Sequence, residues 1–186
     1  KERIIDFFQN IFIVKKKLTD KRIIHYFEWG NKNIHFYDVT THKQSKYLVD
    51  FKNYIPKFCR TVVSDHGRLF CIAGRHQDNV CCDWMLEYVE EHKQLEHRAN
   101  LNDPRSDFTA IYESEKDRIY VIGGNDAKNF YKACEYYDIG IDEWIRMAEL
   151  NVARDSAACC IFNAKFIYVF SGRLKFSPKE ITDVCE

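Results

Sequence analysis

The chain has 186 residues, of which 46% are hydrophobic and 30% are charged, a composition typical of a folded globular protein. Its 28 basic residues equal its 28 acidic residues in number, so it lacks the basic excess of proteins that bind nucleic-acid phosphates. No hydrophobic run approaches the roughly 18 residues of a membrane-spanning helix. We therefore expect neither a nucleic-acid partner nor membrane insertion.

Short β-rich runs that end in glycine recur along the chain. Residues 68–74, 118–124 and 166–172 are good copies, and residues 24–30 are a poorer one. Their final glycines Gly74, Gly124 and Gly172 are 50 and 48 residues apart. Tyrosines and basic residues follow the same period: Tyr37, Tyr88, Tyr137; Lys57, Arg105, Arg154. Three landmarks on one period indicate a repeat architecture.

Two segments are ambiguous when the chain is taken in order. Residues 1–9 are a linker or the end of a preceding element, and residues 10–14 align with a first strand. Residues 83–96 are rich in helix formers, and His92 and Glu96 would align only on a helix. The repeat register instead predicts a third and a fourth strand there, and we follow the register.

The unit between Arg105 and Arg154 shows what one period contains. Residues 108–112, 118–123, 133–137 and 143–147 are short hydrophobic runs, and polar turn residues separate them. Four strands in 45–50 residues describe one blade of a β-propeller. The hydrophobic second strand is typical of a strand that is buried on both faces.

This unit also carries a family pattern. A glycine doublet follows the second strand, then come a Tyr-Asp pair, a tryptophan six residues after that aspartate, and an arginine before the next unit: Gly123, Gly124, Tyr137, Asp138, Trp144, Arg154. The pattern resembles the kelch repeat. The resemblance extends over essentially the whole chain, although the other copies have diverged. It implies an all-β, kelch-type β-propeller with about four four-stranded blades present.

The resemblance also implies blade boundaries. We expect blades at residues 10–56, 57–104 and 105–153, and an incomplete blade at 154–186. The last residues, 184–186, align with 133–135, at the start of a third strand. Since kelch propellers usually have six blades, we expect the chain to be part of a larger propeller that the rest of its polypeptide completes.

The repeat-motif residues are expected to be structural. Glycine permits close backbone approach, tryptophan buries a large surface between blades, and arginine suits an inter-blade hydrogen-bond network. The residues are Gly74, Gly123, Gly124, Gly172, Tyr137, Asp138, Trp144, Arg105 and Arg154.

Partner-binding residues are expected in the loops at one end of the propeller. In kelch proteins of the substrate-adaptor type, partners are held after the glycine doublet and just after the basic position. On this chain those places are Arg75, His76, Asn125, Asp126, Arg173, Cys59, Asp107 and Ser156. Arg75 and Arg173 match in position, and two guanidiniums on one rim would grip a partner that bears a carboxylate.

No motif for catalysis or for a metal is found. The eight cysteines form no CxxC pattern, and the histidines form no HExxH pair. We expect reduced thiols in a cytoplasmic protein, with no cofactor and no metal. A metal-dependent oxidase, which some kelch-like propellers support, is the alternative from another class.

The sequence thus predicts a non-catalytic scaffold for protein–protein interaction. Two roles compete within that class. One is substrate recognition for a cullin-type ubiquitin ligase, which needs a BTB domain outside this chain. The other is a cytoskeletal or ciliary structural component that binds actin or microtubule assemblies.

Overall fold

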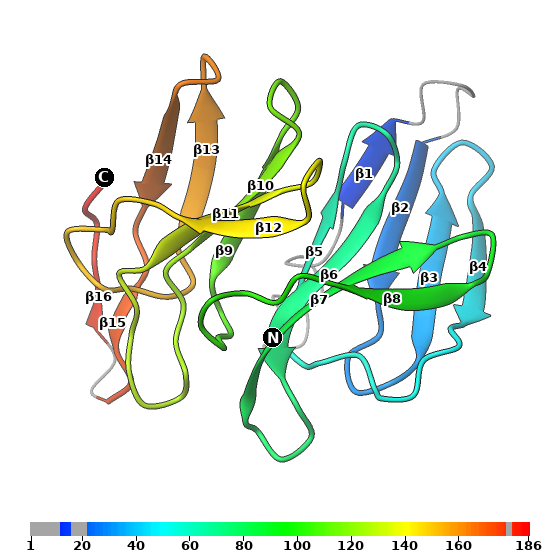
Figure 1. Ribbon diagram of the computed structural model, residues 1–186, viewed down its shortest axis with the longest axis horizontal. Helices are drawn as coiled ribbons and strands as arrows, with labels where there is room; N and C mark the ends of the chain where they lie inside the picture. The colour runs from blue at the N-terminus through cyan, green and yellow to red at the C-terminus, as the bar shows by residue number, and fades with distance from the viewer. Residues whose placement is uncertain (1–11, 16–21, 178–179) are drawn as a thin grey trace.

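The computed structural model describes residues 12–15, 22–177 and 180–186, and these ranges contain strands but no helix (Figure 1). Residues 1–9, interpreted above as a linker or the end of a preceding element, lie outside the described residues. The strands of the first sheet are β1 (Phe12–Lys15), β2 (Arg22–Phe27), β3 (Asn33–Asp38) and β4 (Lys43–Leu48). Those of the second are β5 (Arg60–Val63), β6 (Leu69–Arg75), β7 (Cys81–Val89) and β8 (Gln94–Arg98).

The third sheet and the last group of strands continue the series. The third sheet has β9 (Thr109–Glu113), β10 (Arg118–Ile122), β11 (Cys134–Asp138) and β12 (Glu143–Arg146). The last group has the hairpins β13 (Ala158–Phe162) with β14 (Phe166–Phe170), and β15 (Arg173–Lys175) with β16 (Glu180–Ile181). Within each sheet the strands pair antiparallel in chain order, which is the arrangement of propeller blades.

The sheets stand side by side in chain order, from β1–β4 on the right of Figure 1 to β13–β16 on the left. Their first strands contact one another in sequence, β1 with β5, β5 with β9, and β9 with β13. The connections from second to third strands lie at the lower end of the sheets in Figure 1, and we call this the lower end. The sheets fall within residues 10–56, 57–104, 105–153 and 154–186.

A separate hydrophobic core fills each junction between neighbouring sheets. Strand alternation explains how the helix-forming segment 83–96 became β7 and β8. Met85 packs into the core shared with the third sheet, and Leu86 packs into the core shared with the first. Burial on two opposite faces outweighs local helix propensity. His92 and Glu96 come within 3.8 Å across the β7–β8 turn, so their alignment needs no helix.

Two buried arginines connect successive sheets. The carbonyl oxygen of Arg105 accepts a hydrogen bond from the N–H of Gly74 in the second sheet at 2.9 Å. Its guanidinium donates to the carbonyl oxygens of Gly123 and Ala133 in the third sheet, at 3.2 and 3.0 Å, and pairs with Glu135 at 2.8 Å. One residue therefore satisfies backbone groups of two sheets.

Arg154 repeats this arrangement one unit later. Its carbonyl oxygen accepts from Gly124, and its guanidinium donates to the carbonyl oxygens of Ser171 and Val184 at 2.9 Å each. Glu186 takes the place of Glu135 as its ion-pair partner. Residues 184–186 therefore match residues 133–135 in geometry, as the repeat predicts.

Lys57 is not the structural equivalent of Arg105 and Arg154. The sequence-based alignment of these three basic residues is therefore wrong for Lys57. The N–H of Gly30 bonds to the carbonyl oxygen of Ile55, as Gly74 does to Arg105. Lys57 instead pairs with Arg75, as Ser106 pairs with Asn125. Pro56 is thus one extra residue between the two equivalent positions, and the junction of the first and second sheets has a buried isoleucine where the others have an arginine.

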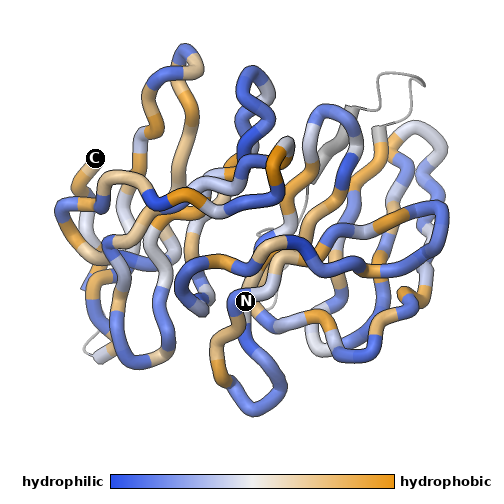
Figure 2. Tube along the Cα trace, in the orientation of Figure 1, coloured by the Kyte–Doolittle hydropathy of each residue, from blue (hydrophilic) through white to orange (hydrophobic). Residues whose placement is uncertain are grey.

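Hydrophobic residues are frequent along the hairpin β13–β14 (Figure 2), and the side chains on one of its faces are exposed. Phe166 is 57% exposed, and Tyr168 and Phe170 on the same face are 39% and 40% exposed. Tyr120 and Ile122 of β10, at the positions equivalent to Tyr168 and Phe170, are buried. In the described residues, no further sheet covers this face of β14.

The buried arginine predicts a large loss of stability on substitution. Arg105→Met removes a fully buried side chain, its ion pair with the buried Glu135, and its hydrogen bonds to the carbonyl oxygens of Gly123 and Ala133. We expect the free energy of unfolding in urea to fall by about 3 kcal/mol or more. Arg146→Met is the control, because Arg146 is largely exposed and pairs with Asp103 at the surface. It should cost less than about 1 kcal/mol, and equal losses would contradict this role of Arg105.

A second pair of variants tests the close approach at Gly74. Its φ is +111°, and a Cβ there would lie 2.5 Å from the carbonyl oxygen of Lys57. At Gly67, with φ of +80°, a Cβ would meet no atom within 4 Å. We expect Gly67→Ala to lower stability by about 1 kcal/mol through backbone strain alone. Gly74→Ala should cost at least about 2 kcal/mol more, measured by thermal unfolding.

Candidate binding site

The lower end carries a matched position in three successive sheets. Arg75, Asn125 and Arg173 each follow the glycine that ends a second strand. Each pairs through its backbone with the residue that leads into the first strand of its own sheet: Lys57, Ser106 and Asp155. The repeat therefore brings chemically different side chains to equivalent places around the first strands.

Six of these lower-end residues form one continuous hydrogen-bonded set, which we call the polar chain: Arg75, Ser106, Asp107, Asn125, Asp155 and Arg173. Arg75 donates to Ser106 Oγ at 2.8 Å and to Asn125 Oδ1 at 2.7 Å. Asn125 Nδ2 in turn donates to Asp155 Oδ2 at 2.6 Å. The polar chain thus extends over three sheets.

Carboxylates of the protein itself already pair with both guanidiniums. Arg173 binds Asp155 in bidentate fashion at 3.0 and 2.5 Å, and this hydrogen bonding raises the pKa of Arg173. Arg75 lies 3.4 Å from Asp107, which also accepts from Ser106. The sequence predicts that these two arginines bind a carboxylate of a partner. Internal pairing leaves them less suited to that task than to fixing the surface.

Aromatic rings flank the same guanidiniums. Arg173 lies 5.7 Å from the ring centre of Phe130 and 5.2 Å from that of Phe176, and these two rings are 4.3 Å apart. Arg75 lies 5.8 Å from the ring of Phe58. The exposed surface here combines planar cations with aromatic faces, which is the composition of many protein interfaces.

The other predicted binding residues lie at the same end but outside the polar chain. His76 packs against the ring of Trp84, with ring centres 4.4 Å apart. Ser156 is exposed, and its N–H donates to the carbonyl oxygen of Asp107 at 2.7 Å. Cys59 is fully buried, so it cannot contact a partner at this rim. Its structural equivalent is Phe108, because the extra Pro56 shifts the register.

Asp126 shapes the loop after the glycine doublet. Its carboxylate accepts hydrogen bonds from the N–H groups of Lys128 and Asn129, at 2.8 and 2.6 Å, and from the Tyr131 hydroxyl at 3.2 Å. Burial on its own would raise the pKa of Asp126, but these donors outweigh it and lower the pKa to about 2. Asp126 therefore holds the loop rather than offering a free charge.

Sequence reasoning missed Ser106 and Asp155. Each comes directly after a buried arginine, and each is almost completely buried. The residues predicted instead were their neighbours in the chain, Asp107 and Ser156. The sequence feature that could have identified them is a polar residue directly after each of Arg105 and Arg154. Cys81 was missed as well: burial raises the pKa of its thiol, which donates to Ser106 Oγ at 3.7 Å.

The motif residues of the third sheet have internal partners. The hydroxyl of Tyr137 donates to Asp142 at 2.6 Å, and Asp138 pairs with Arg118 at 3.1 Å. Trp144 Nε1 donates to the carbonyl oxygen of Ala99 at 2.8 Å, which connects the third sheet to the segment after β8. All of these contacts are made within the protein, and the structural role of these residues stays a prediction.

Neither a metal cluster nor a spanning helix is found in the part of the chain that the structure describes. In residues 12–15, 22–177 and 180–186, no three His, Cys, Asp or Glu side chains are arranged to hold a metal ion. Over the same ranges, no helix has the length and hydrophobicity needed to cross a bilayer. All eight cysteines are free thiols.

Comparison with known proteins agrees with this geometry. The Kelch motif family model matches residues 116–151, which include β10, β11 and β12. The chain is 28% identical over 130 residues to Kelch-like protein 41a of Danio rerio, across 67% of this chain and 21% of that protein. This chain is a kelch-repeat protein.

Further relatives of this kelch-repeat chain come from a plant and from a virus. The F-box/kelch-repeat protein At2g44130 of Arabidopsis thaliana is 30% identical over 106 residues, which cover 54% of this chain and 25% of that protein. The Kelch repeat and BTB domain-containing protein 2 of Ectromelia virus (strain Moscow) is 24% identical over 165 residues, which cover 84% of this chain and 28% of that protein. The chain thus spans between about a fifth and somewhat over a quarter of the length of these relatives.

The hydrogen bonds to Asp126 predict a pH dependence for the loop. The pKa of Asp126 in the folded chain is about 2, below the usual 3.8, so the ionised form stabilises the loop above about pH 4. That contribution is lost as the pH falls from about 4 towards 2. We expect the amide NMR signals of Lys128 and Asn129 to shift with a midpoint near pH 2, and to stay unshifted in Asp126→Asn. A midpoint near pH 4 would contradict the assignment.

Proposed function

We propose that this kelch-repeat chain is part of a non-catalytic scaffold that binds a protein partner through its lower end. The observation that carries the proposal is the polar chain, which fixes charged and amide groups from three sheets in one surface. Groups whose rotamers are held by mutual hydrogen bonds lose little entropy on binding. The loops after β6 and β10 surround them and are themselves closed by internal hydrogen bonds.

The proposal includes completion of the propeller by further blades of the same polypeptide. The exposed face of β14 supports this, because Tyr168 and Phe170 occupy the positions of Tyr120 and Ile122, which are only 6% and 4% exposed. The relatives are several times longer than the matched region, which leaves room for such blades. A hydrophobic face of this kind is costly to leave in water.

Within this class we favour the role of substrate recognition for a cullin-type ubiquitin ligase, with the protein in the cytoplasm. The support is that one relative, Kelch repeat and BTB domain-containing protein 2 of Ectromelia virus, joins kelch repeats to a BTB domain. The earlier expectation linked that combination to ligase adaptors. A cytoskeletal or ciliary role has no comparable support in the contacts described here.

Site-specific crosslinking in the cells that make the protein tests which end binds. A photoreactive amino acid replaces Asn129, which is exposed in the lower-end loop, or Glu115, which is exposed in the β9–β10 turn at the opposite end. We expect a crosslinked protein partner from position 129 and none from position 115. Crosslinks only from position 115, or from neither position, would overturn the proposal.

A further inference from the structure

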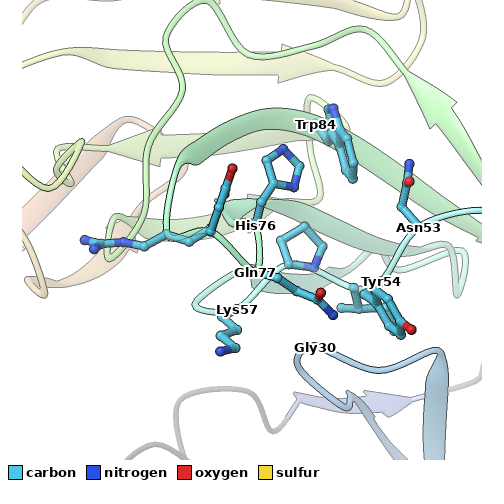
Figure 3. Close-up of a pocket in the computed structure, with 11 residues that line it drawn as sticks. Gly30, Asn53, Tyr54, Lys57, His76, Gln77 and Trp84 are labelled. Carbon is cyan, nitrogen blue, oxygen red and sulfur yellow. The ribbon is translucent and has the colours of Figure 1, made fainter.

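A pocket of about 290 Å³ opens at the lower end, where the first and second sheets meet (Figure 3). It lies between the β2–β3 turn at Gly30, the β4–β5 connection at Tyr54 and Lys57, and the start of the β6–β7 loop at His76. Its volume is below the range of most sites for drug-sized ligands and suits one or two side chains. The polar chain adjoins it through Arg75.

The walls of the pocket are aromatic and well supported. Figure 3 shows His76 and Trp84 on one side and Tyr54 on another. Trp84 packs against Phe51 and His97, with ring centres 6.1 and 5.6 Å apart, so its orientation is determined by three neighbouring rings. Within the described ranges its indole N–H donates no hydrogen bond to the protein. The pocket thus offers rigid walls and an available donor.

The pocket is also lined by Lys57, whose ammonium group has no ion-pair partner among the described residues. The backbone of Lys57 is fixed by two hydrogen bonds with Arg75, at 2.8 and 2.7 Å. Its side chain passes Gly30, where a Cβ would lie 3.5 Å from Lys57 Cε. No carboxylate of the described residues forms an ion pair with Lys57. Lys57 differs in this respect from Arg75 and Arg173, which form ion pairs with Asp107 and Asp155.

One acidic residue opposes this charge. Asp78 lines the rim, and its Oδ1 accepts the N–H of Val80 at 3.1 Å, so its main contact is to its own turn. The lining therefore has the cations Lys57 and Arg75 against a single carboxylate, and Arg75 is shared with Asp107. The resulting local charge is positive and favours an anionic group beside the aromatic walls.

We infer that this pocket binds an aspartate or glutamate side chain of a protein partner, with Lys57 as its ion-pair donor. The inference rests on the proposed function and specifies that the partner presents an acidic side chain. It moves the carboxylate contact from the paired arginines to Lys57, the pocket-lining cation that forms no ion pair with a described residue. The walls formed by Trp84 and Tyr54 accommodate the methylene groups or a neighbouring apolar residue.

The test uses the full chain and a fluorescein-labelled hexaglutamate peptide, followed by fluorescence polarisation at low salt. We expect hexaglutamate to bind and hexalysine not to bind. Lys57→Gln should weaken hexaglutamate binding by roughly three- to tenfold. Lys52→Gln is the matched control, since it removes the same charge from the same connection outside the pocket. It should leave affinity within about twofold, because distant exposed charges are screened.

A third variant is expected to raise the affinity for hexaglutamate instead of lowering it. Asp78→Asn keeps an oxygen that can accept the N–H of Val80 but removes the opposing charge, so hexaglutamate should bind more tightly. Equal losses in Lys52→Gln and Lys57→Gln, tighter binding of hexalysine, or no binding of hexaglutamate would each overturn the inference. If crosslinking from position 129 persists in any of those cases, the pocket inference fails and the proposed function stands. If that crosslinking is lost while hexaglutamate still depends on Lys57, the proposed function fails instead.

Discussion

The buried guanidinium between neighbouring sheets is the interaction on which the architecture depends. Where two sheets meet, backbone carbonyl oxygens are buried and need donors from the protein itself. Arg105 and Arg154 satisfy several of these oxygens at once, and each also pairs with a glutamate of the same sheet. A planar group with five donors in fixed directions suits that task, and a lysine could not replace it. The glycines beside the arginines then follow, because only a residue without a Cβ leaves room for the adjoining backbone.

The lower end shows how a structural repeat becomes a binding surface. The repeat sets the backbone positions of Arg75, Asn125 and Arg173, and their different side chains are free to vary without loss of the fold. Hydrogen bonds among them give a rigid, nearly neutral surface with aromatic rings beside it. A surface of this type contributes orientation and specificity to binding more than net attraction. The ammonium group of Lys57, which forms no ion pair with a described residue, lies next to this surface in the pocket.

Much of the fold could be predicted because each unit needs the same groups in the same places. The period of Gly74, Gly124 and Gly172 located the second strands, and the repeat register favoured strands over a helix for residues 83–96. The burial of Met85 and Leu86 on opposite faces gives the physical reason. Lys57 was assigned wrongly because a single extra residue, Pro56, shifts the register while preserving the apparent spacing. The loop residues after the glycines were within reach of sequence reasoning. The pairing of each guanidinium with Asp107 or Asp155 was not, because it depends on distances between neighbouring sheets.

The substitution of Ile55 for an arginine gives the junctions of this chain different physical characters. The later junctions combine hydrophobic packing with charged hydrogen bonds, whereas the first is joined at this position by burial of an apolar side chain. Hydrophobic burial weakens on cooling, so the first junction is the one whose strength varies most at low temperature. The pocket lies across that same junction, with Gly30 on one side and Arg75 on the other. A molecule seated there would contact both sheets, and its binding free energy would add to the cohesion of the scaffold.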